Sequence, residues 1–378
     1  MKRHGLLIPS TFLAAVLILA MTACSSITPN AGTNNSAIQT DSSMSSAPAT
    51  PLSTASIVLK VSHPDNDTSM LENTWNCYAR TFKNSLEIYS NGEMTCELFP
   101  NDQLGDLTSC MEQCSQGVVD VCLSPATGNL ASWVPNINVF DIPYIVGNID
   151  ACNLVCEGDI YRELSAQLEK AADMRLLSMF QTGFRNIDTW TAPVYSVGDL
   201  AGMKLRIQEI DAHIAMASAW KAVPTTVSFS ELYSAATTGV IDGFENCNYT
   251  LFMKNLYETV NYITETQHLA NVVCTLISGQ VYNGLTPEQQ AAVDRAAADA
   301  RRATIGVVAA NDVNVIAKLK NNGTEIITLS DEEKAAFKEA CYEPCKETVL
   351  KTVDEDFYNR FLASYAEAET ILGIVKTE

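Results

Sequence analysis

The stretch that decides the fold is "IVLKVSHPDNDTSMLENTWNCYARTFKNSLEIYSNGEMTCELFP", residues 57–100. Its first seven residues, "IVLKVSH", predict a strand. A helix is predicted next, starting near Thr68 and stopping at Gly92, a residue type that often ends helices. "EMTCELFP" then predicts a second strand. A strand, a helix and a strand in succession are typical of α/β proteins.

The same alternation continues along the chain. A helix through Met111 is followed by the strand "VVDVCLS" (residues 118–124), and a helix over about residues 150–172 leads to the strand "MRLLSMF" (residues 174–180). The chain is therefore predicted to be an α/β protein with a mostly parallel sheet. Its 378 residues are enough for two domains.

A long helix is predicted within residues 285–323. Thr286 would be its N-cap, and Gln289 completes a capping box. At 1.5 Å per residue, roughly 35 residues reach about 50 Å, which exceeds the diameter of an ordinary domain. Either one helix lies across two domains, or two helices meet near Gly306. A second capping box at residues 330–333 predicts a C-terminal helix.

The N-terminus has the pattern of a targeting segment. Positively charged residues precede a mostly apolar run at residues 6–20, and small residues lead to Cys24. This pattern predicts a signal peptide over residues 1–23 and a lipid on Cys24. The alternative is an uncleaved membrane anchor, but the apolar run is short for a full span. Residues 24–55, rich in Ser, Thr, Ala, Asn and Pro, are expected to be a flexible tether.

The charge balance restricts the partners of this chain. Lys and Arg number 24, Asp and Glu number 44, and the formal net charge is −20. Nucleic acid is excluded as a partner, because phosphate binding requires basic surface. A soluble protein in extracytoplasmic fluid fits this composition.

The twelve cysteines leave eleven if Cys24 carries lipid, so at least one is free or paired between molecules. A metal site would need His or further Cys close by, at spacings such as CxxC. We instead expect small buried thiols and a weakly oxidising habitat. Three pairs are four residues apart: Cys110/Cys114, Cys152/Cys156 and Cys341/Cys345.

Motifs of catalysis are missing from the sequence. It contains no P-loop, no GxGxxG after a strand, no HExxH and no GxSxG. His63, His213 and His268 have no obvious nucleophile or metal partner in the sequence. We therefore expect a protein that is not an enzyme and has no cofactor and no metal. A tethered, acidic, two-domain α/β protein is typical of solute-binding proteins, whose ligand lies in an interdomain cleft.

Several stretches resemble one known family of such proteins. The most specific is "PTTVSFSELYSAATTGVIDGFEN", residues 224–246. Over roughly residues 56–323 the chain resembles the solute-binding proteins of tripartite ATP-independent periplasmic (TRAP) transporters, of the DctP type. The other stretches that carry the resemblance are "ELFPNDQLG" (97–105), "FDIPYIV" (140–146), "TGFRNI" (182–187) and "VGDLAGMKLRIQ" (197–208).

The resemblance implies the fold in more detail. It implies an α/β, two-domain periplasmic-binding-protein-like fold, type II-like and of the TRAP solute-binding type, with a long domain-spanning helix. Domain I would comprise residues 56–182 and 273–284, and domain II residues 183–272. The long helix would span residues 285–323, and residues 324–378 would add a C-terminal strand and helices that pack on the domains.

The resemblance also implies that Arg206 binds the carboxylate of the ligand. At period 2, Arg206 lies on the face of its strand opposite Leu205 and Ile207. A guanidinium presents two parallel N–H donors that match a carboxylate, and it keeps its charge. The alternative is a structural salt bridge to an acidic neighbour such as Glu209 or Asp211.

Other residues match family positions that contact the ligand. Arg185 would help bind the carboxylate or a neighbouring hydroxyl, and its alternative is a surface charge at the lip of the cleft. Asn246 offers an amide that can donate and accept. Phe229 would stack against the ligand or, alternatively, belong to the core. Where family members often have Pro, this chain has Cys247, so the loop there is expected to differ.

The first domain departs more from the family. His63 and Thr127 are expected to supply its contacts with the ligand. Pro125 stands at about the position where sialic-acid-binding members have a Glu, which argues against sialic acid.

The leading hypothesis is an extracytoplasmic, lipid-anchored monomer. It would capture an organic acid, such as a sugar acid, a uronate, a C4-dicarboxylate, or an aromatic or branched monocarboxylate. It would then deliver this acid to the large and small membrane subunits of a TRAP transporter. Two alternatives are a tethered sensor that presents its ligand to a signalling receptor, and a cell-surface enzyme, for which no set of catalytic residues is visible.

Overall fold

The computed structural model describes residues 55–253 and 256–374, and all statements on structure concern these residues. The strands are β1 (Ile57–Ser62), β2 (Met94–Phe99), β3 (Val121–Ala126), β4 (Met174–Thr189), β5 (Lys204–Ile207), β6 (Val223–Thr226), β7 (Gly243–Cys247), β8 (Tyr262–Ser278) and β9 (Glu325–Ile327). The α-helices are α1 (Thr74–Tyr89), α2 (Leu107–Ser115), α3 (Ile149–Val155), α4 (Asp159–Ala172), α5 (Asp211–Ala219), α6 (Leu232–Thr237), α7 (Asn248–Met253), α8 (Gly279–Asn283), α9 (Pro287–Asn321), α10 (Asp331–Val349) and α11 (Glu355–Ile371).

The described strands form one mixed sheet in the order β2-β1-β3-β8-β4-β7-β5-β6, with β9 paired to β8. The pairs β1/β2, β1/β3, β5/β6, β5/β7 and β8/β9 are parallel, whereas β3/β8, β4/β7 and β4/β8 are antiparallel. The α/β class is confirmed. The expectation of a mostly parallel sheet is wrong for its centre, where the longest pairing is antiparallel.

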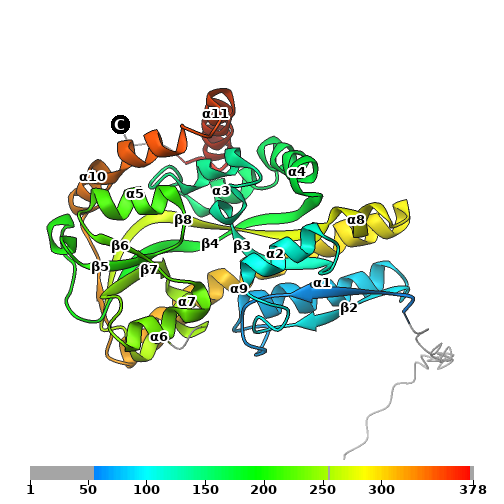
Figure 1. Ribbon diagram of the computed structural model, residues 1–378, viewed down its shortest axis with the longest axis horizontal. Coiled ribbons are helices and arrows are strands. Elements are labelled where there is room, and N and C mark those ends of the chain that lie inside the picture. Colours follow the sequence, from blue (N-terminus) through cyan, green and yellow to red (C-terminus); the bar gives the residue numbers. More distant parts are fainter. Residues whose placement is uncertain (1–54, 254–255, 375–378) are drawn as a thin grey trace, which may run out of the picture. The chain divides into compact units, whose positions relative to one another are not determined.

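The two long strands β4 and β8 connect two groups of shorter strands (Figure 1). They pair from Met174 with Ser278 to Thr189 with Tyr262, with register shifts on the way. The strand β3 pairs with the carboxyl-terminal part of β8, and β7 pairs with the carboxyl-terminal part of β4. We call β1–β3 with the adjoining parts of β4 and β8 the first half-sheet, and β5–β7 with the opposite parts the second half-sheet.

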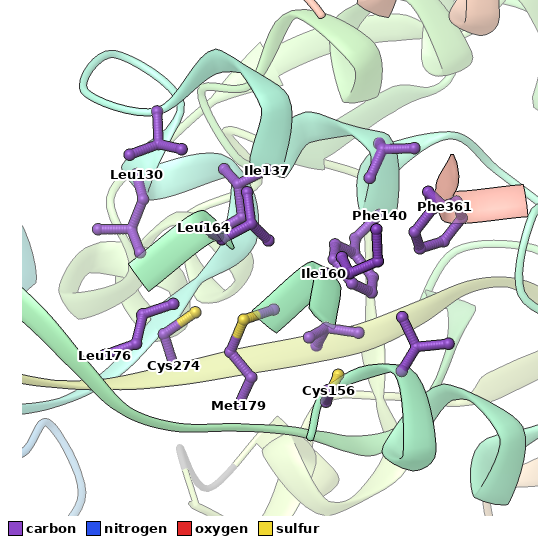
Figure 2. Packing of buried hydrophobic residues seen from close by; sticks show 14 of the residues in the cluster. Leu130, Ile137, Phe140, Cys156, Ile160, Leu164, Leu176, Met179, Cys274 and Phe361 are labelled. Carbon is purple, nitrogen blue, oxygen red and sulfur yellow. The ribbon is translucent and has the colours of Figure 1, made fainter. Parts of the chain in front are cut away.

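Helices cover both faces of the long strands. Met174, Leu176 and Met179 of β4 belong to a buried apolar cluster that includes residues of α3, α4 and α11, part of which is drawn in Figure 2. Leu177 and Phe180 belong to a different cluster, formed with α1 and α9. Successive β4 side chains point to opposite faces, so each face of the sheet is buried under its own helices.

The helix α9 is a single helix of 35 residues. The Thr286 hydroxyl accepts from the backbone N–H of Gln289, and the Gln289 side chain accepts from the Thr286 N–H, so the predicted capping box is confirmed. The alternative of two helices that meet near Gly306 is wrong. The first part of α9 packs with α1 under the first half-sheet, and Val315 and Leu319 pack with residues of the second half-sheet. The helix therefore spans both halves.

Three expected boundaries differ from the structure. The first helix begins at Thr74 and not near Thr68, because the Asn73 side chain accepts from the Asn76 N–H at 2.8 Å and caps it. The helix expected over residues 150–172 is two helices, α3 and α4, with Gly158 as the N-cap of the second. The strand expected at residues 174–180 continues to Thr189. The second capping box, which starts α10, is confirmed.

The eleven described cysteines are all buried, and each is a free thiol. Burial raises the pKa of Cys96 and of Cys247 to about 12, so both are protonated at neutral pH. Cys156 and Cys274 lie among Met179, Ile160 and other apolar residues of the cluster in Figure 2. The prediction of small buried thiols is confirmed for these residues, which pack as apolar groups.

The predicted signal peptide, the lipid on Cys24 and nearly all of the tether lie outside the described residues. Among the residues that the structure does describe, no helix is both long enough and apolar enough to cross a membrane.

Candidate functional site

A cavity of about 270 Å³ lies where strands of both half-sheets end. Ser124 of β3, Arg206 of β5 and Asn246 of β7 line it at or near the carboxyl ends of their strands. The middle of the long strands contributes Arg185 and Asn271. Crevices at the carboxyl ends of strands are the usual ligand sites of open α/β sheets.

Arg206 is buried at this cavity without a counter-ion. The residue is 2% exposed, and its Nε and Nη2 donate to the carbonyl oxygen of Val227 at 2.9 and 2.7 Å. Its Nη1 is buried and has no hydrogen-bond partner. No carboxylate of the described chain lies within 4 Å of its guanidinium, so the structure does not contain the alternative salt bridge to Glu209 or Asp211.

The charge of Arg206 persists despite its burial. Burial lowers the pKa of Arg206 to about 10, against the opposing effect of the negative charge of Glu245. The guanidinium is therefore protonated at neutral pH. A buried cation without a partner anion is costly. The site thus offers a positive charge and an unused donor to an anion that enters the cavity.

Arg185 lies at the same cavity but is fully engaged by the protein. It is 2% exposed, so the alternative of a surface charge at the lip is wrong. Its Nε and Nη2 donate to the two carboxylate oxygens of Glu245, and Nη2 also donates to the Glu245 carbonyl at 2.8 Å. Its Nη1 donates to Asn246 Oδ1 at 3.1 Å and to Asn271 Oδ1 at 2.8 Å. These five hydrogen bonds equal the number of N–H groups in a guanidinium.

Glu245 is fully buried and balances the charge of Arg185. Burial raises the pKa of its carboxyl, but the charge and hydrogen bonds of Arg185, with a hydrogen bond from His268, outweigh this effect and hold the pKa well below its usual range. The ring of His213 lies between two carboxylates: its Nδ1 is 3.8 Å from Glu245 Oε1, and its Nε2 is 3.2 Å from Asp141 Oδ1. The charge of Arg185 and all of its N–H groups are therefore satisfied by buried protein groups without a ligand.

The amide oxygen of Asn246, another residue of the cavity wall, is engaged by the protein. Its Oδ1 accepts from Arg185, from the Cys247 N–H at 2.8 Å and from the Thr250 hydroxyl at 3.2 Å. Its Nδ2 donates to no group of the described chain, so it remains available. Phe229 lines the cavity and also packs against the apolar cluster that contains Phe244.

The two residues of the first domain that were predicted to contact the ligand, His63 and Thr127, are not among the described residues that line this cavity. The Thr127 hydroxyl donates to Asp141 Oδ2 at 2.9 Å, so it belongs to the polar chain that leads to His213. His63 lines a separate hollow with Asn76 and Arg80. Burial lowers the pKa of His63 to about 4, against the opposing charge of Asp67, so it is neutral at physiological pH.

Sequence reasoning missed several residues of the cavity wall. Asn271 is a polar residue in the apolar run of β8, which was a visible signal. Ser124 has a φ of 89°, at an irregular pairing between β3 and β8. Such backbone strain in a residue other than glycine concentrates at functional sites. Asp102 and Asp106, in the turn before α2, also line the cavity.

Comparison with known proteins identifies the family. The sequence model of bacterial extracellular solute-binding protein family 7 (DctP) matches residues 67–352. A solute-binding protein of Roseobacter denitrificans is 28% identical over 300 residues, which cover 79% of this chain and 88% of that protein. The C4-dicarboxylate-binding periplasmic protein DctP of Rhodobacter capsulatus is 30% identical over 263 residues, with coverage of 69% and 78%.

A solved structure supports the same assignment. A TRAP periplasmic solute-binding protein from Roseobacter denitrificans with bound L-galactonate matches with a TM-score of 0.74 and 27% identity, covering 83% of this chain and all of that one. The fold predicted from the sequence is thereby confirmed. Together these findings show that the chain belongs to the DctP family, the bacterial extracellular solute-binding proteins of family 7.

Proposed function

We propose that this protein captures an organic acid in the cavity described above and delivers it to the membrane subunits of a TRAP transporter. The observation that carries the proposal is the buried guanidinium of Arg206, which has no counter-ion and has an unused Nη1. A ligand carboxylate would supply the missing anion and accept from that donor. The relatives bind ligands that fit, since their names specify a C4-dicarboxylate and L-galactonate.

The remaining site residues act around this contact. The free Nδ2 of Asn246 would donate to an oxygen of the ligand, and Phe229 would provide an apolar wall. Arg185 would act indirectly, because it holds Asn246 and Asn271 in place through Nη1. His63 and Thr127 are left out of the proposed contacts.

The domain boundaries remain a proposal too. The register between β4 and β8 shifts between Gln181 and Phe184, beside Gly183 with its φ of 121°. A hinge at residues 182–183 and 272–273 would let the two half-sheets close on the ligand, with α9 spanning both. Small-angle scattering should then show compaction when the acid is added. An unchanged radius of gyration at saturating ligand would contradict the hinge.

Delivery requires a position outside the cytoplasm, and the relatives include periplasmic proteins. We propose that a lipid on Cys24 anchors a monomer and that residues 25–55 let the domains reach the transporter. Mass spectrometry of the membrane fraction should find diacylglycerol on Cys24, and a mature protein that begins at Met1 would refute it. The sensor alternative is not favoured, because the relatives are named as solute-binding proteins, one of them of a TRAP transporter.

A screen of organic acids by native mass spectrometry, followed by calorimetric titration, tests the proposal. Arg206→Ala should weaken binding of the identified acid by about 2–5 kcal/mol, on the order of 30-fold to several thousand-fold. Arg206→Lys should recover only part, because an ammonium lacks the planar fork. The exposed Arg302 of α9 offers a matched control, and Arg302→Ala should bind normally. Unchanged affinity in Arg206→Ala would refute the carboxylate contact.

A further inference from the structure

Two neighbouring residues of the cavity wall indicate which kind of organic acid it binds. We infer that Asn246 and Thr250 together recognise a hydroxyl group of the ligand, so that the protein selects hydroxy acids over amino acids and over acids without a hydroxyl. This inference rests on the proposed function. It narrows the candidate acids, and it assigns a role in specificity to Thr250, which sequence reasoning missed.

The first step is the orientation of the Asn246 side-chain amide. Its Oδ1 lies 3.1 Å from Arg185 Nη1 and 2.8 Å from the backbone nitrogen of Cys247. Both of these nitrogens carry hydrogen and can only donate, so the amide atom that faces them has to be the oxygen. Cys247 supplies an N–H that a proline at the same position would lack. The other terminal atom of the amide is therefore Nδ2, and it donates to no group of the described chain.

The second step is the direction of the hydrogen bond between Asn246 and Thr250. Thr250 Oγ1 lies 3.2 Å from Asn246 Oδ1. Because an amide oxygen has no hydrogen, the Thr250 hydroxyl donates its only proton to this bond. It makes no other hydrogen bond within the described chain, so its oxygen keeps lone pairs that can accept. Thr250 therefore offers an acceptor, whereas Asn246 Nδ2 offers a donor.

The third step is what this donor and this acceptor bind together. Asn246 and Thr250 both line the cavity and are 6% and 3% exposed. A ligand hydroxyl can accept from Nδ2 and donate to Thr250 Oγ1 at the same time. An ammonium group only donates and a carbonyl oxygen only accepts, so each of them satisfies one member of the pair. In a buried site, a polar group that is left without its partner weakens binding.

The fourth step is the distance from the carboxylate contact. The strands β5 and β7 pair in parallel, and Arg206 lies opposite Phe244. Asn246 follows Phe244 by two residues, so their side chains share one face of the sheet and are about 7 Å apart along the strand. The pair formed by Asn246 and Thr250 is thus within reach of an acid whose carboxylate contacts Arg206 in a cavity of about 270 Å³.

Matched acids test the inference on the full-length protein by calorimetric titration. Lactate, pyruvate, alanine and propionate share three carbons and carry a hydroxyl, a carbonyl oxygen, an ammonium or only hydrogen at carbon 2. 4-Hydroxybutyrate, succinate semialdehyde, 4-aminobutyrate and butyrate form the same series at carbon 4. Galactonate, 6-aminohexanoate and hexanoate form a six-carbon series.

The series that contains the tightest binder decides the result. In it we expect the hydroxy acid to bind at least about tenfold more tightly than the amino acid and than the acid with neither group. The carbonyl acid should bind with intermediate affinity, because the Thr250 hydroxyl would have to turn away from Asn246 to donate to it.

Removal of the Thr250 hydroxyl should reduce this preference. Thr250→Val keeps the shape of the side chain, and Asn246 Oδ1 keeps its two nitrogen donors. The variant should bind the hydroxy acid several-fold to about tenfold more weakly, yet bind the acid without a hydroxyl as the unchanged protein does. Thr250→Ser retains the hydroxyl and should recover most of the affinity. The control is Thr304→Val in α9, whose buried hydroxyl donates to the Ala300 carbonyl within the helix, and it should leave the preference unchanged.

The outcomes separate this inference from the proposed function. If acids bind and binding depends on Arg206, but the hydroxy acid binds no more tightly than its matched acids, the inference is wrong and the proposed function stands. Equal loss of both kinds of acid in Thr250→Val would also refute it, because Thr250 would then act only through the structure. If no acid of any series or of the screen binds, or if Arg206→Ala binds normally, the proposed function fails, and the inference fails with it.

Discussion

Arg206 and Arg185 are both 2% exposed and line the same cavity, yet they occupy opposite electrostatic situations. Arg185 on β4 forms five hydrogen bonds, three of them to Glu245. Arg206 on β5 has one carbonyl acceptor and no carboxylate. The difference teaches that an arginine at a binding site is available to a ligand only if the protein has not already satisfied it.

The largest expected effect on stability comes from breaking the buried ion pair between Arg185 and Glu245. Glu245→Ala leaves the Arg185 guanidinium buried without its anion, which should reduce the free energy of unfolding by about 3–5 kcal/mol. Urea unfolding of the unliganded protein measures this loss. Glu245→Gln keeps an acceptor for Arg185 and should cost less. If Glu245→Ala unfolds like the unchanged protein, Arg185 does not depend on Glu245.

The sequence allowed the role of Arg206 to be predicted, but not the saturation of Arg185. The alternation of Leu205, Arg206 and Ile207 placed a cation within a strand, and the resemblance gave it a ligand. The saturation of Arg185 depends on Glu245 and Asn271, which are 60 and 86 residues away along the chain. Only the antiparallel pairing of β4 with β7 and with β8 brings these residues together. Local patterns carry no information about such pairings.

The helices and strands show the same limit. The capping box at Thr286 is a local signal, and it located the start of α9 correctly. The break between α3 and α4 at Gly158 was missed, because one glycine within a helical pattern is often tolerated. The position of Thr127 away from the cavity has a tertiary cause, since its hydroxyl donates to Asp141, which is 14 residues away along the chain.

A smaller effect concerns the pH dependence of stability that arises from His268, which is hydrogen-bonded to Glu245. Burial lowers the pKa of His268, although its hydrogen bond with Glu245 opposes this. A base whose pKa is lower in the folded state contributes stability that is full above the unfolded pKa of about 6.5 and is lost as the pH falls below it. His268→Gln should therefore be less stable than the unchanged protein at pH 7.5, by an amount that shrinks as the pH falls from about 6.5.

Thermal or urea unfolding of both proteins between pH 7.5 and 5 gives this difference. Comparing the two proteins cancels the titration of other groups, including Asp188, whose pKa burial raises. His63 serves as a control outside the network, since burial lowers its pKa to about 4. The difference in stability between His63→Gln and the unchanged protein should also shrink as the pH falls, which shows that the measurement detects a buried neutral histidine. A constant difference for His268→Gln would mean that this histidine does not stay neutral in the fold.

The smallest expected effect is on the stability of the protein without its ligand when Arg206 is removed. Arg206→Ala loses the hydrogen bonds to the Val227 carbonyl, but it also removes a buried charge that has no counter-ion. These contributions oppose each other, so the free energy of unfolding should change by no more than about 1 kcal/mol. Urea unfolding of Arg206→Ala and Glu245→Ala side by side gives the change in the free energy of unfolding for each of the two arginine sites. The ligand should stabilise the unchanged protein and stabilise Arg206→Ala far less at the same concentration. If Arg206→Ala is instead as unstable as Glu245→Ala without ligand, Arg206 is structural, and the contrast between the two arginines disappears.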